Sequence, residues 1–305
     1  MKMTMVSVII PTYNRAEFLR SAIESALKQT FTDIEIIVSD DRSTDHTRSV
    51  ARCFNDSRVR YIENTGKKGP SAARNAAIMV SKGKYIAFLD DDDEWLPEKL
   101  EWQIEVLEKN RPNVCGIYSN LIAIDKLSGK TFFEDPRTEK LKGNLLYVLG
   151  VCNPVKTTTL IVRKSCLDEI GMFDETISYM EDWDLLIRLS EKWDFEYISK
   201  PLVKYYYHDQ GQLTENIEGQ IVGKEALFRR YPHIFKKNKK RWSEYLLGLG
   251  LQYCQLKKMK NGRKNILKAI FADPFKTVAY LHFFASLLTP SHYQRLRNFY
   301  KSGFN

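Results

Sequence analysis

A short apolar segment that ends in four consecutive aspartates carries the strongest chemical signal in the sequence. The segment Lys84–Leu89 has the composition of a buried strand, and Asp90–Asp93 follow it directly. Adjacent carboxylates repel one another and raise one another's pKa unless a positive charge lies among them. Mg²⁺ and Mn²⁺ prefer such oxygen ligands and keep positions open for the phosphates of a substrate. We therefore expect a divalent cation here, in preference to a solvated acidic turn before the helix at Pro97.

Strand-like and helix-like segments alternate through the first 120 residues. Strands are expected at Val6–Ile10, Ile34–Val38, Val59–Ile62, Lys84–Leu89 and Cys115–Tyr118. Such a chain folds as a parallel sheet with helices on both faces, and ligands bind beyond the carboxyl ends of its strands. Pro11–Asn14, Asp41 and Asn64 follow the first three strands, so we expect them beside the aspartates. No GxGxxG follows the first strand, which argues against a dinucleotide fingerprint.

Local signals also place the ends of several helices. Asn14 and Glu17 have the spacing of a capping box at a helix start. Pro70 stands where a first helical residue is expected, and Gly83 marks the end of that helix. A further helix is expected from Pro97 to Asn110.

The middle of the chain is less regular. We expect a polar excursion over residues 125–140, a helix at Leu141–Leu149, and strands at Thr159–Val162, Phe195–Ile198 and Val203–Tyr207, the last of which ends at His208. The segment Tyr179–Asp184 opens a helix and contains three acids. Acids in a first helical turn are ordinary partners of the helix dipole, so this cluster is a weak signal by itself.

Length and composition limit the class of protein. The 305 residues, 43 % of them hydrophobic, suffice for one large domain with an appendage or for two domains. The five cysteines form an odd set without a CxxC pair, so neither a disulfide framework nor a zinc site is expected, and a reducing cytoplasm fits. Neither a signal peptide nor the roughly 20-residue apolar run of a membrane span is recognisable.

The net charge of +9 is unevenly distributed. From Arg229 onward, 17 Lys and Arg face two acids, whereas the preceding residues hold 30 basic and 36 acidic side chains. We expect an acidic catalytic domain over residues 1–215 and a basic helical region over 216–305. The basic region mixes its lysines with aromatic and aliphatic side chains, which suits an anionic membrane surface. An ordinary helical subdomain that only packs on the catalytic domain is the alternative.

Five segments in order resemble the motifs of the inverting family 2 glycosyltransferases of the bacterial surface-polysaccharide type. They are Val6–Arg15, Asp40–Asp45, Gly69–Asn75, Phe88–Asp93 and Glu181–Trp183, and the resemblance covers roughly residues 5–215. It implies the GT-A fold, a Rossmann-like α/β architecture with a mostly parallel sheet. A nucleotide-sugar half would span about 1–120 and an acceptor half about 121–215.

The resemblance also implies roles for individual residues. The nucleotide-sugar donor would be held by Pro11, Tyr13, Asn14, Asp41, Asn64, Arg74, Asp90 and Asp91. A carboxylate such as Asp41 can accept from the uracil N3–H, and the Arg74 guanidinium suits a diphosphate, although a helix-surface arginine is an equal alternative. Asp92 would bind Mn²⁺ or Mg²⁺ directly, with an ambiguity of one position in the run of four. His208 either reaches the metal or the diphosphate, or is structural.

Asp182 matches the catalytic base of the family. The acceptor hydroxyl must lose its proton as it attacks the sugar C1, and one carboxylate on the opposite face of the sugar achieves this with inversion. Glu181 and Trp183 would orient the acceptor. A divalent cation would stabilise the charge of the departing nucleoside diphosphate.

Other functions fit less well. The Gln-x-x-Arg-Trp motif of processive synthases is missing after Asp182, so we expect transfer of one sugar, with a UDP-sugar preferred, to a glycan or lipid-linked acceptor. The site of action would be the inner face of the cell membrane. A sugar-phosphate nucleotidyltransferase would need a Gly-rich basic loop where Pro11–Asn14 stands. A nucleic-acid-binding protein that uses the basic region is the remaining alternative, and no nucleic-acid partner is expected.

Overall fold

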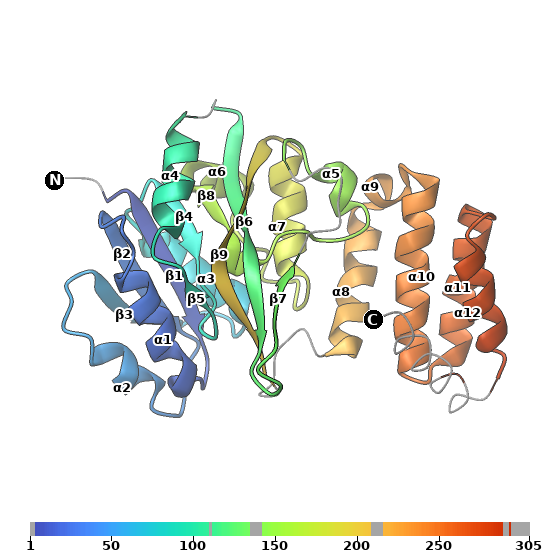
Figure 1. The fold of residues 1–305 in the computed structure, drawn as a ribbon, viewed down its shortest axis with the longest axis horizontal. Helices are drawn as coiled ribbons and strands as arrows, with labels where there is room; N and C mark the ends of the chain where they lie inside the picture. Colours follow the sequence, from blue (N-terminus) through green and yellow to red (C-terminus); the bar gives the residue numbers. More distant parts are fainter. Residues whose placement is uncertain (1–3, 110–111, 135–141, 209–215, 289–292, 294–305) are drawn as a thin grey trace. The chain divides into compact units, whose positions relative to one another are not determined.

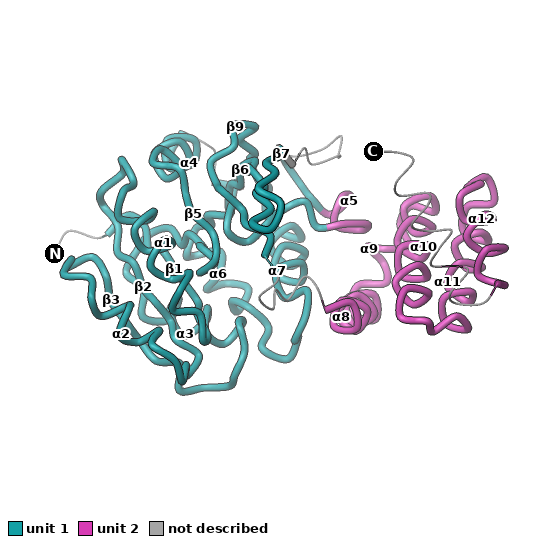
Figure 2. Tube along the Cα trace, turned by 60° about the horizontal axis from the view of Figure 1, so that its bottom comes forward, with its two compact units in different colours: residues 1–145, 153–211 teal, residues 146–152, 212–305 magenta. Residues whose placement is uncertain are grey.

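Two compact units make up the chain (Figure 2). This computed structural model describes residues 4–109, 112–134, 142–208, 216–288 and 293. The first unit, here called the sheet unit, comprises residues 1–145 and 153–211, and the second, the helical unit, comprises 146–152 and 212–305. The expected division at residue 215 differs from this one, because the short segment 146–152 groups with the C-terminal helices. Residue 215 itself lies outside the described residues.

A nine-stranded sheet is the centre of the sheet unit within the described residues (Figure 1). Its strands are β1 (Val6–Thr12), β2 (Ile34–Asp40), β3 (Val59–Glu63), β4 (Tyr85–Phe88), β5 (Glu94–Trp95), β6 (Val114–Asp125), β7 (Thr131–Glu134), β8 (Ile161–Arg163) and β9 (Asp194–Tyr207). They lie in the order β3-β2-β1-β4-β8-β6-β9-β5, with β7 paired to β6. The first four are mutually parallel, as expected.

Beyond β4 the sheet is mixed. The short strand β8 pairs antiparallel with both β4 and β6, so β6 is not the direct parallel neighbour of β4. The two strands expected over 195–207 form the single strand β9, which pairs with β6 in parallel through register shifts. The expected polar excursion contains β7, which forms a hairpin with β6, and residues 135–141 lie outside the described part.

Seven helices and one 3₁₀ turn accompany the described strands along the chain up to residue 190. They are α1 (Ala16–Leu27), α2 (Thr47–Arg52), α3 (Pro70–Val80), α4 (Lys99–Lys109), α5 (Leu146–Leu149), η1 (Thr157–Thr159), α6 (Lys164–Ile170) and α7 (Glu181–Ser190). Pro70 is the first residue of α3, as predicted. Gly83 lies beyond the end of that helix, and a Cβ there would come within 2.4 Å of the Ser7 backbone nitrogen. Its absent side chain therefore permits close packing against β1.

The capping box predicted for Asn14 and Glu17 is wrong. Arg15 is the residue before α1 and its side chain does not cap the helix, whereas Asp45 Oδ2 accepts a hydrogen bond of 3.2 Å from the backbone N–H of Ala16, the first helical residue. Asn14 has a φ of 51°, and its Oδ1 accepts a hydrogen bond of 2.7 Å from the Thr44 backbone N–H. Asn14 therefore connects the loops that follow β1 and β2. Its side-chain oxygen is directed to Thr44 and cannot cap α1.

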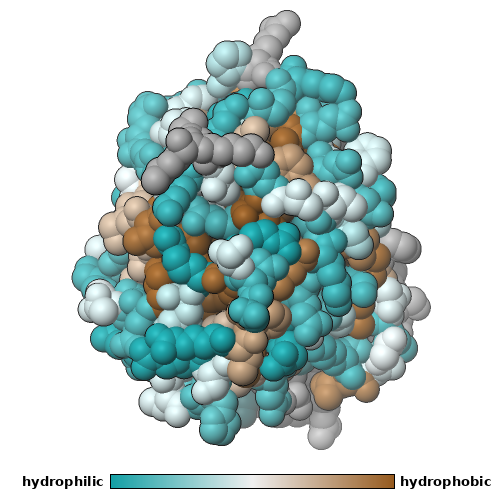
Figure 3. Space-filling model, turned by 90° about the vertical axis from the view of Figure 1, so that its left-hand side faces the viewer, coloured by the Kyte–Doolittle hydropathy of each residue, from teal (hydrophilic) through white to brown (hydrophobic). Residues whose placement is uncertain are grey.

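The core explains why β1 is central. Every residue of β1 is buried, and successive side chains of a strand point to opposite faces, so both faces of the sheet are covered. Leu19, Ala22, Ile23 and Ala26 recur at helical spacing and place one face of α1 in this core. Figure 3 shows the side of the molecule that is at the left of Figure 1, where hydrophilic atoms dominate and hydrophobic ones form smaller patches.

The helical unit contains α5 and five further helices among the described residues. They are α8 (Ile217–Arg230), α9 (Pro232–Lys236), α10 (Lys239–Gln255), α11 (Met259–Ala272) and α12 (Thr277–Ala285). The helices α10 and α11 approach closely, since a Cβ on Gly250 would lie 2.7 Å from a side-chain carbon of Ile266. None of the helices described is both long and apolar enough to cross a membrane.

Candidate active site

The four aspartates after β4 separate into two environments. Asp93 is 1 % exposed, and its Oδ1 accepts a hydrogen bond of 3.1 Å from the backbone N–H of Tyr206 on β9. Burial raises the pKa of Asp93 well above its ordinary value, and the negative charges of Asp92 and Asp90 raise it further. Asp93 therefore points into the protein, whereas the other three carboxylates pair with cationic or imidazole side chains.

Arg15 neutralises two of these carboxylates. Its Nη1 lies 3.2 Å from Asp91 Oδ1 and 2.5 Å from Asp92 Oδ2. Burial raises the pKa of Asp91 to about 7 although the Arg15 charge opposes that change, and the Asp92 charge adds to it. Arg15 lies three residues after the end of β1, so the parallel neighbours β1 and β4 bring a cation and its acids to the same edge of the sheet.

His208 belongs to the same cluster. Its Nε2 lies 3.1 Å from Asp92 Oδ2, and its ring stacks on Phe18 of α1 at a centroid distance of 4.7 Å. His208 directly follows β9, which begins at Asp194 and pairs in parallel with β6. The structure therefore places His208 beside Asp92, the residue expected from the sequence to bind a metal.

Asp92 and His208 fit a hard divalent cation that a substrate helps to bind. Within the described residues, no group of three or more Asp, Glu, His or Cys side chains could hold a metal alone. Mg²⁺ and its relatives are commonly held by one or two protein ligands together with substrate phosphates. A carboxylate oxygen and an imidazole nitrogen 3.1 Å apart can both reach one ion, so the residues fit a metal that binds together with a diphosphate.

A second set of loops surrounds Asp41. Its Oδ1 accepts from Asn64 Nδ2 at 2.7 Å and its Oδ2 from the Gly69 backbone N–H at 2.8 Å. Tyr13 is 45 % exposed, and Lys68 Nζ lies 4.6 Å from the centroid of its ring. The loops after β1, β2 and β3 thus meet around an exposed aromatic face and a fixed carboxylate, while Pro11 is buried in β1 as part of their support.

Arg74 connects the aspartates to the start of α7. Its Nη2 lies 2.9 Å from Asp90 Oδ1 and its Nη1 lies 3.0 Å from Glu181 Oε1. Arg74 is 7 % exposed; burial alone would lower its pKa, but the charges of Asp90 and Glu181 raise it. The alternative of a helix-surface arginine is therefore wrong, because α3 turns this side chain inward onto two carboxylates.

Asp182 has the properties of a general base. Burial, and then the neighbouring Glu181 charge, raise its pKa to about 6. Its Oδ2 accepts a hydrogen bond of 2.8 Å from Asn153 Nδ2, and its Oδ1 accepts one of 2.8 Å from the Trp183 backbone N–H. A carboxyl with this pKa is ionised at neutral pH and can still take up a proton readily. The Trp183 side chain is 3 % exposed and belongs to the core behind it.

Comparison with known proteins identifies the family. Residues 7–166 match the model of glycosyl transferase family 2. An Escherichia coli UDP-Glc:alpha-D-GlcNAc-diphosphoundecaprenol beta-1,3-glucosyltransferase is 34 % identical over 72 % of this chain and 84 % of its own length. The chain belongs to glycosyl transferase family 2. This glycosyltransferase is therefore an enzyme, and the family decides against the nucleotidyltransferase and the non-enzymatic nucleic-acid binder.

Solved structures confirm the fold of this glycosyltransferase. Residues 1–349 of Staphylococcus aureus TarS in complex with UDP-GlcNAc match with a TM-score of 0.65, 18 % identity, and coverage of 98 % of this chain and 92 % of that one. The Pyrobaculum calidifontis mannosyltransferase in complex with GDP-Man and Mn²⁺ matches with a TM-score of 0.59, 18 % identity, and coverage of 92 % and 79 %. The GT-A fold expected from the sequence is thus confirmed.

Three side chains of the glycosyltransferase site were not assigned a role from the sequence. They are Arg15, Lys68 and Asn153. Arg15 belongs to the first motif segment, Val6–Arg15. A cation in the loop after the first strand could have been predicted to pair with the aspartates at the same edge of the sheet. Asn153 lies in the irregular middle of the chain, where no periodicity fixes its neighbours, so its contact with Asp182 had no signal.

Proposed function

We propose that the protein is an inverting, metal-dependent glycosyltransferase that moves one sugar from a UDP-sugar to a hydroxyl of a lipid-linked oligosaccharide. One observation carries the proposal: Arg74 binds Asp90 of the aspartate cluster and Glu181 beside the candidate base Asp182. One buried guanidinium thereby joins the aspartate cluster of the donor site to the residue that precedes the candidate base. This is the arrangement that a displacement at a sugar C1 requires.

The donor half supplies binding and charge stabilisation. The exposed ring of Tyr13 offers a face for the uracil, and the fixed Asp41 carboxylate has further lone pairs for its N3–H. Asp92 and His208 would hold Mn²⁺ or Mg²⁺, which supplies Lewis-acid stabilisation of the diphosphate leaving group. Asp90, Asp91 and Arg74 would lie around the ribose and the diphosphate.

The chemical step is a displacement with inversion. The acceptor oxygen forms a bond to the sugar C1 while the bond from C1 to the diphosphate oxygen breaks. Asp182 takes the proton of the acceptor hydroxyl, and the negative charge leaves on the nucleoside diphosphate. The hydrogen bonds from Asn153 and the Trp183 N–H orient the carboxylate for this transfer. Glu181 orients the acceptor or its neighbours while it remains paired with Arg74.

The relatives and the surface of the helical unit support a lipid-linked acceptor. The name of the Escherichia coli relative states a diphosphoundecaprenol-linked acceptor, and another relative from that species is a putative colanic acid biosynthesis glycosyl transferase. On α11, α12 and the turns beside them, Phe271, Phe275, Leu281 and Phe284 are 81 %, 92 %, 58 % and 63 % exposed. Exposed aromatic side chains among lysines favour peripheral attachment to the cytoplasmic, anionic face of a membrane.

A donor-binding experiment tests the proposal. The thermal midpoint of the full chain would be measured with UDP-, GDP- and dTDP-sugars, each with and without Mn²⁺, followed by hydrolysis of the best donor. A ligand that binds only the folded state raises the midpoint by mass action. We expect a UDP-sugar with Mn²⁺ to give the largest rise and a slow release of UDP. A rise that is equal with and without Mn²⁺ would reject metal dependence, and a larger rise with GDP- or dTDP-sugars would reject the UDP donor.

A further inference from the structure

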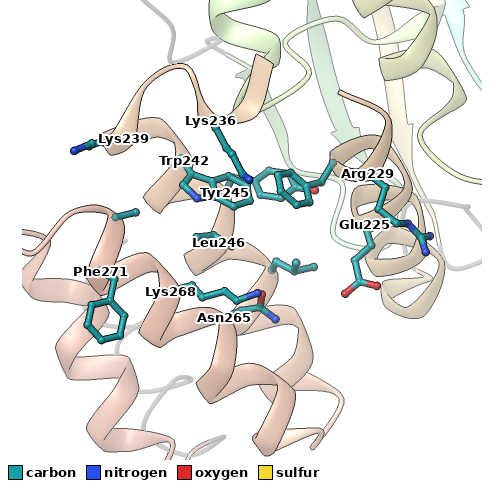
Figure 4. A pocket seen from close by; sticks show the side chains of 13 residues that line it. Glu225, Arg229, Lys236, Lys239, Trp242, Tyr245, Leu246, Asn265, Lys268 and Phe271 are labelled. Atoms are coloured by element: carbon teal, nitrogen blue, oxygen red, sulfur yellow. The ribbon is translucent and has the colours of Figure 1, made fainter. Parts of the chain in front are cut away.

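A pocket in the helical unit has no assigned role (Figure 4). It lies among α8, α9, α10 and α11 and has a volume of about 650 Å³, within the usual range of small-ligand sites of ~300–1,000 Å³. Its walls combine aromatic and aliphatic side chains with several cations. All of them belong to one compact unit, so the pocket is a property of the helical unit alone.

The apolar wall of the pocket is an aromatic stack. The rings of Phe228 and Trp242 stack at a centroid distance of 4.5 Å, and those of Trp242 and Tyr245 stack at 5.5 Å. Tyr245 is 4 % exposed, and Leu246 and Leu249 continue the wall. Because the rings are stacked, the ring faces that meet are not available to a ligand. This favours an aliphatic chain over a nucleobase or a sugar, which would need a ring face.

Four cations line the same pocket: Arg229, Lys236, Lys239 and Lys268. In the part of the chain that the structure describes, no ion pair joins any of them to a carboxylate. The one acid in the lining, Glu225, accepts a hydrogen bond of 2.6 Å from Tyr253. The pocket thus carries an uncompensated positive charge beside a hydrocarbon wall, and an anion with an attached hydrocarbon chain is the ligand that complements both.

We propose that this pocket binds the isoprenoid diphosphate end of a lipid-linked acceptor. The inference rests on the proposed function and deepens it, because it names the part of the acceptor that the helical unit recognises. A diphosphate carries more anionic oxygens than a single phosphate and can therefore pair with more of the lining cations at once. An isoprenoid diphosphate has one hydrocarbon chain, which a single pocket can hold, whereas a phospholipid has two acyl chains to accommodate. Phe271 lines the pocket and is 81 % exposed, so the hydrocarbon wall continues to the surface where a longer chain can leave.

Binding of farnesyl diphosphate to the full chain tests this site. The titration would be followed by calorimetry in saturating UDP and Mn²⁺, so that the diphosphate cannot enter the donor site. Inorganic diphosphate and farnesol are the two halves of the probe, and a short-chain phosphatidylglycerol is the phospholipid probe. We expect saturable one-to-one binding of farnesyl diphosphate and at least tenfold weaker binding of each other probe, because each lacks one half of the complementarity or has the wrong number of chains.

Two variants with matched charge change locate the site. The double change Lys236→Gln with Lys268→Gln removes two exposed cations of the lining whose side chains point toward the pocket, so folding is not at risk (Figure 4). Loss of one charge-assisted contact lowers affinity about tenfold, so we expect the affinity of the double variant for farnesyl diphosphate to fall by at least about tenfold. The control is Lys260→Gln with Lys264→Gln, two exposed lysines of α11 outside the lining, which should change affinity less than twofold. Trp242→Ala tests the hydrocarbon wall, with its thermal midpoint measured beside the affinity.

The outcomes separate this proposal from the proposed function. No saturable binding, equal loss in the control variant, or equally tight binding of phosphatidylglycerol would each overturn the isoprenoid diphosphate site. UDP-sugar hydrolysis, measured on the same protein preparations with Mn²⁺ but without added UDP, reports on the donor site alone. Hydrolysis without farnesyl diphosphate binding would reject the pocket and leave the transferase intact, whereas binding without hydrolysis in Mn²⁺ would reject the proposed reaction and leave the pocket.

Discussion

His208 Nε2 and Asp92 Oδ2 lie 3.1 Å apart although 116 residues separate them in the chain. The loop after β4 supplies one atom and the end of β9 supplies the other, and stacking on Phe18 fixes the imidazole. A carboxylate oxygen and a ring nitrogen in this relationship could supply two ligands to the proposed divalent cation, with substrate phosphates and water supplying the others. The first prediction tests that interpretation.

Asp92→Asn should abolish transfer and weaken UDP binding in Mn²⁺ while the protein stays folded. An amide oxygen carries no net charge, so it cannot neutralise the cation. Activity and calorimetric UDP affinity are the measurements, and Asp168→Asn, an exposed carboxylate paired with Lys164, is the control. His208→Ala should give a smaller loss that excess Mn²⁺ partly restores. Turnover of Asp92→Asn near that of the wild type would mean that the cluster is a solvated turn.

Arg15→Ala should lower the thermal midpoint without metal and raise the affinity for Mn²⁺. The change leaves Asp91 and Asp92 without their cation, which costs about 1–3 kcal/mol, or several degrees. It also makes the site more negative, which attracts the ion. Midpoints measured with and without Mn²⁺ check this, and the deficit should shrink when Mn²⁺ is present. A deficit that is the same in both conditions would show that Arg15 acts only as packing.

Asp182→Asn should reduce turnover by at least about 10²-fold, the usual scale of general-base catalysis. Donor affinity should barely change, and Glu181→Gln should have a milder effect. Because the base must be ionised and its pKa is raised to about 6, kcat/KM should fall as the pH is lowered through about 6 and be flat above it. A pH–rate series on both proteins provides the check. A large loss of UDP-sugar affinity in Asp182→Asn would instead place this residue in the donor site.

Asn153→Ala should move the acid limb of that pH profile to higher pH by about one unit. Its amide stabilises the ionised form of Asp182, and a hydrogen bond to a charged group is worth about 1.5–3 kcal/mol. Asn153→Asp should move the limb further, because it puts a second negative charge beside Asp182. The matched control is Asn113→Ala, whose amide binds the distant Asp194. An unchanged limb in both Asn153 variants would leave this residue a purely structural role.

Phe275→Ser combined with Phe284→Ser should weaken binding to anionic liposomes by at least about tenfold. Full burial of one such side chain contributes about 1.5–3 kcal/mol, and both are largely exposed on the helical unit. Co-sedimentation with vesicles of varied anionic content, at low and high salt, measures the effect. Met79→Ser with Leu127→Ser removes comparably exposed apolar side chains from the sheet unit and should pellet like the wild type. Equal pelleting of all three proteins would reject attachment through α12.

The sequence predicted those parts of the fold whose signals are local. The alternation over β1 to β4 and the first turn of α3 follow from apolar periodicity and from Pro70, which act within a few residues. The strand expected at Thr159–Val162 overlaps β8, but its antiparallel insertion between β4 and β6 had no such signal, because strand order depends on contacts between segments that are distant in sequence. The failed capping box at Asn14 has the same origin: a tertiary contact with Thr44 outweighs a local preference.

The candidate site divides in a similar way. Asp41, Asn64 and the aspartates after β4 could be placed at one edge because parallel strands share their carboxyl ends. The inward orientation of Asp93 could not, since it depends on a backbone N–H of β9. Asn153 approaches Asp182 only because the segment before η1 and the start of α7 fold together, and neither segment constrains the other in sequence.

The grouping of residues 146–152 with the helical unit has a consequence for the order in which the chain can fold during synthesis. Val148 and Leu149 of α5 are fully buried, and α5 packs against α9, which begins at Pro232. Residue 232 is made 83 positions after Leu149. At a translation rate of about 5–20 residues per second, Pro232 is added roughly 4–17 s after Leu149, so α5 lacks its packing partner during that interval. The sheet unit can therefore form its own core first, and the helical unit can be completed only after α9 and the helices that follow it have been translated.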